Sequence, residues 1–250
     1  MAMHLPVCFV ATTFNVWKDV RWPERKEALE SYIKVSSPDI LCLQELRLET
    51  RNLLDVVLPD HSRVDDGFEG WSNESNIYWN THLFELVSYG AEQIGILEPL
   101  RRLFWVRLRV RGLQRTLMVA TAHYSYQGTE REKNEGINPR IEQARKTIDA
   151  LNKLSFEEET VLFMGDLNDS VNAIRVLKSG GLQDSFSALG TPLVPTHPAI
   201  PTSPGTLPQV IDWQFHKGPI RVMNTSVVDY FHGDIAPSDH KPVVTTYVLT

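Results

Sequence analysis

The chain has 250 residues, of which 42% are hydrophobic and 22% are charged. This is the composition of a globular protein, and with two cysteines it excludes a disordered chain, a fibrous chain and a disulfide scaffold. The net charge of −6 gives no general attraction for polyanions, which argues against a deep surface for duplex nucleic acid. The length suits one large domain, so we expect residues 1–250 to form a single domain.

The N-terminal residues indicate where the protein resides. Residues 1–14 contain no Lys or Arg and no small-residue cleavage site, so we expect no signal peptide. No apolar run approaches the roughly 20 residues that a membrane helix needs. We therefore expect a soluble, monomeric protein of the cytoplasm, or of the nucleus in a eukaryote, that is not secreted. Cys8 and Cys42 lie in apolar segments and are expected to be buried, reduced thiols.

The first quarter of the chain predicts two strands joined by a helix. Residues 6–14 and 39–44 are rich in β-branched and apolar side chains, which is typical of buried strands. Between them, Pro23 suits the first turn of a helix whose apolar face holds Ala28, Leu29, Tyr32 and Ile33. This order predicts a parallel strand pair with a helical crossover. A second short helix is expected over residues 50–58.

The middle of the chain predicts strands with few helical signals. We expect them over residues 75–79, 83–88, 103–111 and 116–122. Arg107, Arg109 and Arg111 alternate with apolar residues in the third of these strands. They form either the solvated face of an outer hairpin or a stripe that follows phosphates.

The rest of the chain returns to mixed helix and strand. A polar loop over residues 124–138 ends at Asn138, which can cap a helix that begins at Pro139. We then expect a helix over 170–178 and strands over 161–164, 210–215, 220–228 and 242–249. The six prolines of residues 192–208 predict a rigid extended loop. Two sheets packed face to face, with helices on their outer faces, fit this order of elements in an α/β (α+β) fold.

Polar side chains of catalytic type lie at the ends of several predicted strands. They are Asn15, Glu45, His123, Asp166, Asn168, Asp212, Asp239 and His240. Each alone is compatible with a turn, but together they are typical of a site on a rigid scaffold. Carboxylate and amide oxygens without a cysteine ligand select a hard cation, Mg²⁺ or Mn²⁺. With imidazoles that can transfer protons, this set suits phosphoester hydrolysis, and the sequence lacks a Walker loop or a Gly-x-Ser-x-Gly elbow.

Six short motifs occur in a recognisable order. They read Thr13-Phe14-Asn15, Leu43-Gln44-Glu45, Thr121-Ala122-His123, Gly165-Asp166-Leu167-Asn168, Ile211-Asp212-Trp213 and Ser238-Asp239-His240. In this order they resemble the endonuclease/exonuclease/phosphatase superfamily of deoxyribonuclease I-like metal-dependent phosphoesterases. The resemblance implies a four-layered α/β/β/α sandwich with two mixed sheets. Two non-reacting positions depart from the family pattern: Leu167, where an aromatic residue is common, and Tyr124, where the family has leucine.

The resemblance also implies a metal site. Glu45 looks like the main ligand of a Mg²⁺ or Mn²⁺ ion, with Asn15 and Asp239 close to the same ion. Asp166 looks like the group that aligns or deprotonates the attacking water, or holds a second metal.

Four further roles follow from the same resemblance. Asn168 is similar to the amide that orients the phosphate. His123 and His240 look like the two histidines that flank the phosphate, and Asp212 like the carboxylate that holds one of them.

Three more residues are candidates for substrate binding. Trp17 follows the first motif and could stack on a base at the rim of the site. Arg140 opens the helix after the polar loop and could face a phosphate. Trp213 either packs in the core or borders the substrate.

The choice of phosphoester depends on loops, so several functions stay open. The first is a Mg²⁺/Mn²⁺-dependent phosphodiesterase that acts on nucleic-acid ends, short single strands or protein–DNA adducts. The second is a phosphatase or phosphodiesterase for a small phosphorylated metabolite, an inositol phosphate or a lipid headgroup. The third, from another class, is a catalytically silent phosphate-binding module.

Overall fold

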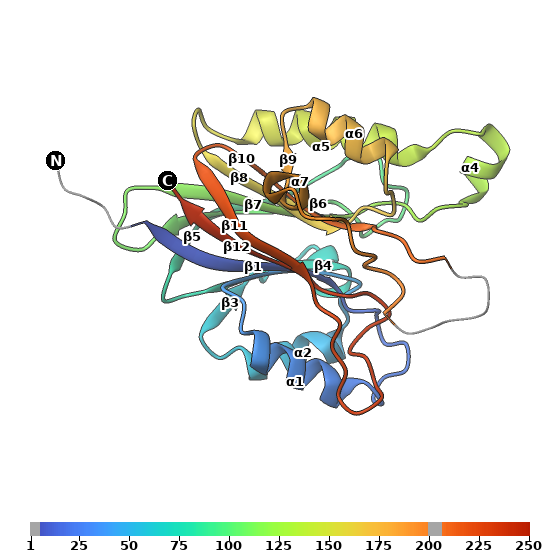
Figure 1. Ribbon diagram of the computed structural model, residues 1–250, viewed down its shortest axis with the longest axis horizontal. Coiled ribbons are helices and arrows are strands. Elements are labelled where there is room, and N and C mark those ends of the chain that lie inside the picture. Colours follow the sequence, from blue (N-terminus) through green and yellow to red (C-terminus); the bar gives the residue numbers. More distant parts are fainter. Residues whose placement is uncertain (1–5, 200–206) are drawn as a thin grey trace.

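The computed structural model describes residues 6–199 and 207–250 and has the expected α/β/β/α layers. Two six-stranded sheets pack face to face, and helices cover the outer face of each sheet (Figure 1). Residues 200–206 of the proline-rich loop and residues 1–5 lie outside the described residues. Within the described ranges, no helix combines the length and the apolar character that a membrane crossing requires.

The first sheet combines the N-terminal strands with the last two strands of the chain. Its order is β11 (Ile220–Val227), β12 (Val243–Leu249), β1 (Val7–Asn15), β2 (Ile40–Gln44), β4 (Ser75–Asn80) and β3 (His61–Arg63). β1 and β2 run parallel, as predicted, and the other neighbours are antiparallel. The outer face is covered by α1 (Lys26–Ser36) and α2 (Leu48–Val57) (Figure 1).

The second sheet repeats this plan with one parallel pair near its centre. Its order is β5 (Phe84–Glu92), β6 (Leu103–Val110), β7 (Thr116–His123), β8 (Thr160–Asp166), β10 (Asp212–Lys217) and β9 (Gln183–Asp184). β7 and β8 are the parallel pair. α5 (Pro139–Leu154) and α6 (Asn172–Ser179) lie over its outer face (Figure 1). Three short helices occupy connections: α3 (Gly70–Asn73), α4 (Glu130–Glu135) and α7 (Ser185–Leu189).

Buried polar contacts fix how the two sheets align near one end of the sandwich. Gln44 Nε2 donates to Thr121 Oγ1 at 2.8 Å, across the space between the sheets. Gln214 Nε2 makes a second tie to the Ala11 carbonyl at 3.1 Å. Gln44 directly precedes Glu45, and Thr121 lies two residues before His123. The first tie therefore brings two predicted site residues from different sheets toward one another.

Three local expectations are wrong. Cys8 is exposed, because the outer face of β1 becomes covered only further along the strand, where Thr12 is buried; Cys42 is buried as predicted. α1 begins at Lys26 rather than at Pro23, since residues 23–25 form a turn. The polar loop over residues 124–138 contains α4, which is capped by the Thr129 side chain.

Two of the alternating arginines, Arg107 and Arg109 of β6, form ion pairs with carboxylates of the protein itself. Arg107 is 7% exposed, and its Nε lies 2.7 Å from Glu159 Oε1. Arg109 pairs with Glu85 on the neighbouring β5 at 3.5 Å. Because Arg107 is buried and paired, the residues do not form a free stripe for phosphates.

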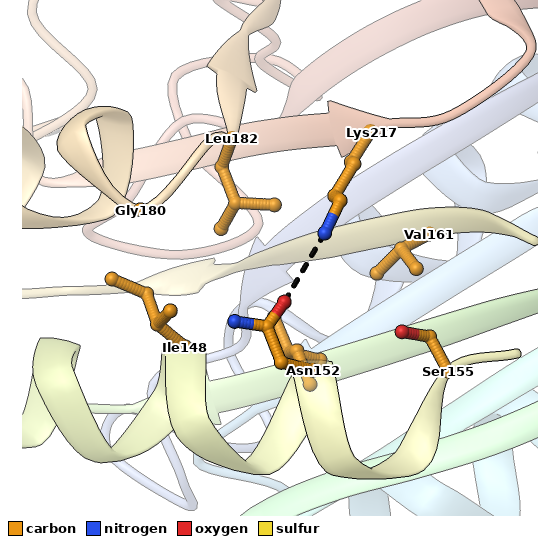
Figure 2. A pocket seen from close by; sticks show the side chains of 8 residues that line it. Ile148, Asn152, Ser155, Val161, Gly180, Leu182 and Lys217 are labelled. Carbon is orange, nitrogen blue, oxygen red and sulfur yellow. Dashed lines mark hydrogen bonds between the residues drawn. The ribbon is translucent and has the colours of Figure 1, made fainter. Parts of the chain in front are cut away.

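A small pocket between α5 and β8 is part of the packing of helix on sheet (Figure 2). Ile148 and Leu182 line it, and Lys217 Nζ donates to Asn152 Oδ1 across it at 3.1 Å. None of its lining residues belongs to the six motifs, so this pocket is not the candidate site.

Candidate active site

The six motifs meet at one end of the sandwich. Asn15 ends β1 and Glu45 follows β2, while His123 and Asp166 end the parallel strands β7 and β8. The strand register pairs His123 with Asp166, and Asp166 with Asp212 at the start of β10. Parallel strands bring their carboxyl ends to one edge, so this end of the fold gathers the polar residues.

The glycine of the fourth motif permits this close approach. A Cβ atom built on Gly165 would lie 2.1 Å from the Ala122 carbonyl oxygen of β7. A side chain at this position would therefore push β8 away from β7, beside His123 and Asp166.

Asp166 is the centre of the site. It is 1% exposed, and its Oδ2 accepts a hydrogen bond from Asn15 Nδ2 at 3.0 Å. His123 Nε2 and His240 Nε2 lie 3.3 Å and 3.7 Å from the same oxygen. Burial alone would raise the pKa of Asp166, but the charges of His240 and His123 and the bond from Asn15 lower it. Asp166 is therefore ionised at neutral pH.

Asp212 holds His240, which answers a question that the sequence left open. His240 Nδ1 donates to Asp212 Oδ2 at 2.9 Å, and both residues are buried. Burial alone would lower the pKa of His240, but the carboxylates of Asp212 and Asp166 raise it well above its usual value. Burial raises the pKa of Asp212. The two carboxylates therefore favour the protonated imidazole of His240, whose Nε2 can donate a hydrogen bond.

Glu74 holds the other histidine in the same way. His123 Nδ1 donates to Glu74 Oε1 at 2.9 Å, and Arg101 forms an ion pair with the same carboxylate oxygen. Burial alone would raise the pKa of Glu74, but the hydrogen bond with His123 and the charges of His123 and Arg101 lower it to about 2. Sequence reasoning missed both Glu74 and Arg101. The signal available for Glu74 was its position directly before the strand that begins at Ser75.

Glu45 and Asp239 are the carboxylates of the site that remain open to solvent. Their side chains are 14% and 16% exposed, whereas those of Asp166 and Asp212 are 2% and 1% exposed. Glu45 Oε1 lies 3.6 Å from Lys18 Nζ, and 4.0 Å from both Arg101 Nη2 and His123 Nε2.

The backbone at Glu45 is held in a strained conformation. Glu45 has a φ of 57°, in the left-handed region that a residue with a Cβ rarely adopts. Its carbonyl accepts from the amide of Lys18, and the amide of Leu46 donates to the Glu74 carbonyl. These bonds from two other segments fix the direction of the Glu45 side chain.

Asn168 is fixed through both its backbone and its side chain. Its amide N–H donates to Asp166 Oδ1 at 3.0 Å, and its side-chain Nδ2 donates to the Tyr124 carbonyl at 3.1 Å. Its φ of 48° is again left-handed, which asparagine tolerates better than most residues. The structure thus brings Asn168 next to Asp166, with its side-chain oxygen not used by these bonds.

The buried Arg25 organises the loop between β1 and α1. Its guanidinium donates to the carbonyls of Trp17, Lys18 and Val20, and to that of Pro237, just before the last motif. The ring of Trp17 lies 5.3 Å from this guanidinium and is half-buried. Sequence reasoning missed Arg25, because its contacts lie in loops without periodicity.

Two of the candidates for substrate binding are structural: Arg140 does not face a phosphate as predicted, and Trp213 takes the core position that was one of its two alternatives. Arg140 is 2% exposed, with its guanidinium 2.6 Å from Glu132 and 3.6 Å from Asp169. It therefore ties α4 to α5 and to the loop after β8. Trp213 is 2% exposed and packs in the cluster between the sheet and α6, where its indole N–H donates to the Asp169 carbonyl. Because both are buried, neither borders the substrate.

Two groups of His and Asp side chains among the described residues have ligand atoms within 4.8 Å of one another. One contains Asp166, Asp212 and His240, all buried; the other contains His197, Asp239 and His240. Glu45 is in neither group. His197 belongs to none of the motifs and was not predicted.

The chain matches the model of the Endonuclease/Exonuclease/phosphatase family over residues 12–240. Since the match covers most of the chain, the protein belongs to this family, whose members hydrolyse phosphoesters. The predicted family and the predicted class of enzyme are thus confirmed. No curated protein matches the chain in sequence.

Solved structures share the fold over nearly their whole length. D. rerio TDP2 in complex with a single-strand DNA product has a TM-score of 0.79 at 18% identity, over 96% of this chain and 98% of that one. A mannosyl-6-phosphatase from Bacteroides thetaiotaomicron has a TM-score of 0.77 at 18% identity, over 95% and 98%. The human Nocturnin catalytic domain with a bound sulfate has a TM-score of 0.76 at 17% identity, over 98% and 97%. At these identities the likeness shows the fold alone.

The low pKa of Glu74 predicts a stability difference that depends on pH. The pKa of Glu74 is about 2 in the folded protein, and its ordinary value is 4.5. The negative charge of Glu74 therefore stabilises the fold fully at pH values above 4.5. We expect Glu74→Gln to lower the free energy of unfolding at pH 7 by on the order of 2–3 kcal/mol. This loss should shrink as the pH falls from 4.5 toward about 2. Urea unfolding at a series of pH values measures it.

The exposed Glu69 on the preceding turn supplies the control, since Glu69→Gln removes a carboxylate without a buried partner. A stability loss in Glu74→Gln that stays constant over the same pH range would contradict the stated charge of Glu74.

Proposed function

We propose that this protein is a divalent-metal-dependent phosphodiesterase that acts on nucleic-acid ends, short single strands or protein–DNA adducts. In the proposed reaction, water attacks phosphorus in line with the leaving oxygen. The observation that carries the proposal is the arrangement of Asp166 between His123 and His240, each of which is held by a carboxylate.

The residues proposed to hold Mg²⁺ or Mn²⁺ are Asn15, Glu45 and Asp239. Their donors are carboxylate and amide oxygens, which fit a hard cation. The partial exposure of Glu45 and Asp239 supports this choice, because an ion from solvent can reach them. A bound ion would polarise a phosphoryl oxygen and stabilise the leaving oxygen.

The remaining residues would manage protons and position the phosphate. Asp166, being ionised, accepts a proton from the attacking water or aligns it. His240, being protonated, donates from Nε2 to a phosphate oxygen where negative charge develops. His123 presents Nε2 from the other side of the same carboxylate, and Asn168 orients the phosphate through its amide.

An open groove lined by aromatic side chains supports a nucleic-acid substrate. It has a volume of about 520 Å³ and is lined by Phe68, Trp71, Tyr89 and Arg102 among others. Arg102 follows Arg101, which reaches Glu74, and Trp71 lies in α3, which ends one residue before Glu74. Two residues that line the groove are therefore close in sequence to Arg101 and Glu74. Trp71 is buried, whereas Tyr89 is 40% exposed. An exposed aromatic face of this kind stacks on bases of a single strand regardless of sequence.

A second candidate is a phosphatase or phosphodiesterase for a small phosphorylated metabolite, an inositol phosphate or a lipid headgroup. The observation that favours it is Lys18, whose partly exposed ammonium lies 3.6 Å from Glu45 Oε1. An additional cation beside the metal ligands suits the dianion of a phosphomonoester. The fold shared with the mannosyl-6-phosphatase is compatible with this candidate. A silent binding module is disfavoured, because every reacting residue type is present.

We also propose that the protein is a monomer of the cytoplasm, or of the nucleus in a eukaryote. The two thiols, Cys8 and Cys42, are both free, which suits a reducing compartment.

The metal assignment predicts that Glu45→Gln abolishes hydrolysis while the fold persists. The amide keeps the shape of the side chain but removes the negative charge that a divalent cation needs. Hydrolysis is measured with Mg²⁺, with Mn²⁺ and with a chelator, and circular dichroism checks the fold. Full activity of Glu45→Gln in Mg²⁺ would refute the assignment.

The groove predicts that oligonucleotides are cleaved and that truncation of Tyr89 weakens this cleavage. We expect hydrolysis of short oligonucleotides in a panel that also contains nucleotides, inositol phosphates and sugar phosphates. Tyr89→Ala should lower kcat/KM for an oligonucleotide by about 10-fold, since one stacked base contributes about 1–3 kcal/mol. Phe156→Ala is the matched control, because Phe156 is an exposed aromatic residue that precedes β8, at the end of this strand opposite Asp166.

Hydrolysis of small monoesters without cleavage of any oligonucleotide would remove the first candidate and leave the second.

A further inference from the structure

The proline-rich segment places a third imidazole beside the site. His197 Nε2 lies 3.8 Å from Asp239 Oδ2. The ring centroids of His197 and His240 are 4.8 Å apart, and the rings are tilted by 49°. The proposed hydrolysis does not use His197, so its position requires a separate explanation.

Backbone hydrogen bonds fix the segment that carries His197. The amide of His197 donates to the Gln209 carbonyl at 3.1 Å, and the amide of Gln209 donates back at 2.8 Å. The neighbouring Thr196 is tied to the site as well: its carbonyl accepts from the amide of Lys241, and its Oγ1 accepts from the amide of Asp212. His197 is therefore fastened to the segments that carry Asp212 and His240.

The three side chains have the spacing of a metal site. The ligand atoms of His197, Asp239 and His240 all lie within 4.8 Å of one another. Neighbouring ligands around a tetrahedral zinc ion, each about 2.0–2.1 Å from it, are about 3.4 Å apart. The distance between His197 Nε2 and Asp239 Oδ2 is 3.8 Å, slightly longer than this value. Small rotations of the two side chains would bring the atoms to the zinc spacing.

A carboxylate orients the ring of His240, as is usual for a histidine that binds a metal ion. Its Nδ1 donates to the Asp212 carboxylate, which leaves Nε2 as the ligand atom. A metal ion that binds there replaces the proton on Nε2, which is released to solvent. A carboxylate that orients a histidine through its other nitrogen is the usual second partner of a zinc-bound imidazole. The side chains of His197, Asp239 and His240 are 24%, 16% and 8% exposed, so the group is open to an ion from solvent.

We propose that His197, Asp239 and His240 form a binding site for a transition-metal ion, with Zn²⁺ as the best-fitting ion. Two imidazoles and one carboxylate are the donor set that zinc prefers, whereas Mg²⁺ prefers oxygen donors. The site is distinct from the proposed Mg²⁺ or Mn²⁺ site, although Asp239 belongs to both. An ion here occupies His240 Nε2, which is the atom proposed to donate to the phosphate. Zn²⁺ therefore inhibits hydrolysis, a consequence that rests on the proposed function.

Calorimetric titration with ZnCl₂ tests the site on the whole chain without a polyhistidine tag. We expect wild type to bind Zn²⁺ and His197→Asn to bind it at least about 10-fold more weakly, because a direct ligand is lost. His232→Asn is the matched control, since His232 is an exposed histidine outside the group and its loss should leave Zn²⁺ affinity unchanged. Glu45→Gln should also retain the Zn²⁺ affinity.

Melting curves verify that each variant is folded, and Zn²⁺ should raise the melting temperature of wild type more than that of His197→Asn. His197→Gln serves as a second variant if His197→Asn is unstable. Equal Zn²⁺ affinity of wild type and both His197 variants would overturn the proposal, as would the absence of binding to wild type. A chain that binds Zn²⁺ through His197 but hydrolyses no phosphoester would contradict the proposed function alone.

Discussion

The buried charge of Asp166 is the constraint on which the rest of the site depends. An isolated carboxylate in the interior costs several kcal/mol of desolvation, so it persists only with partners in good geometry. Here Asn15 and the Asn168 amide donate to it, and the imidazoles of His123 and His240 lie beside it. Each imidazole in turn has its own carboxylate. Loss of any one partner would leave this buried charge less well compensated.

These partners come from both sheets, which explains why the layers are locked near this end. Asn15 and Glu74 belong to the first sheet or its connections, whereas His123 and Asp166 end strands of the second. A small slip between the sheets would break the contacts of Asp166. The buried tie from Gln44 to Thr121 prevents such a slip within one or two residues of Glu45 and His123.

Most of the framework could be predicted from the sequence, because strand and helix periodicity and the motifs carry strong local signals. The parallel pair β1/β2 and the Asn138 cap of α5 follow from residues that are close in sequence. What the sequence does not reveal are contacts between distant loops. Arg25 reads as one more cation of a helix start, yet it binds four carbonyls from two loops.

The same limit explains the errors at the site. Arg140 was expected near phosphate because it is a cation beside a polar loop, but α4 brings Glu132 to it. For Trp213 the sequence left two alternatives, and strand alternation turns it to the face opposite Asp212, into the core. His197 gave no signal, because its relation to Asp239 arises only when the proline-rich segment pairs with Gln209.

Anomalous diffraction from a crystal soaked in MnCl₂ tests the central claim most directly. The account predicts one manganese peak within bonding distance of Glu45, next to Asn15 and on the solvent side of Asp166. Manganese bound elsewhere on the molecule, with no peak at Glu45, would contradict it.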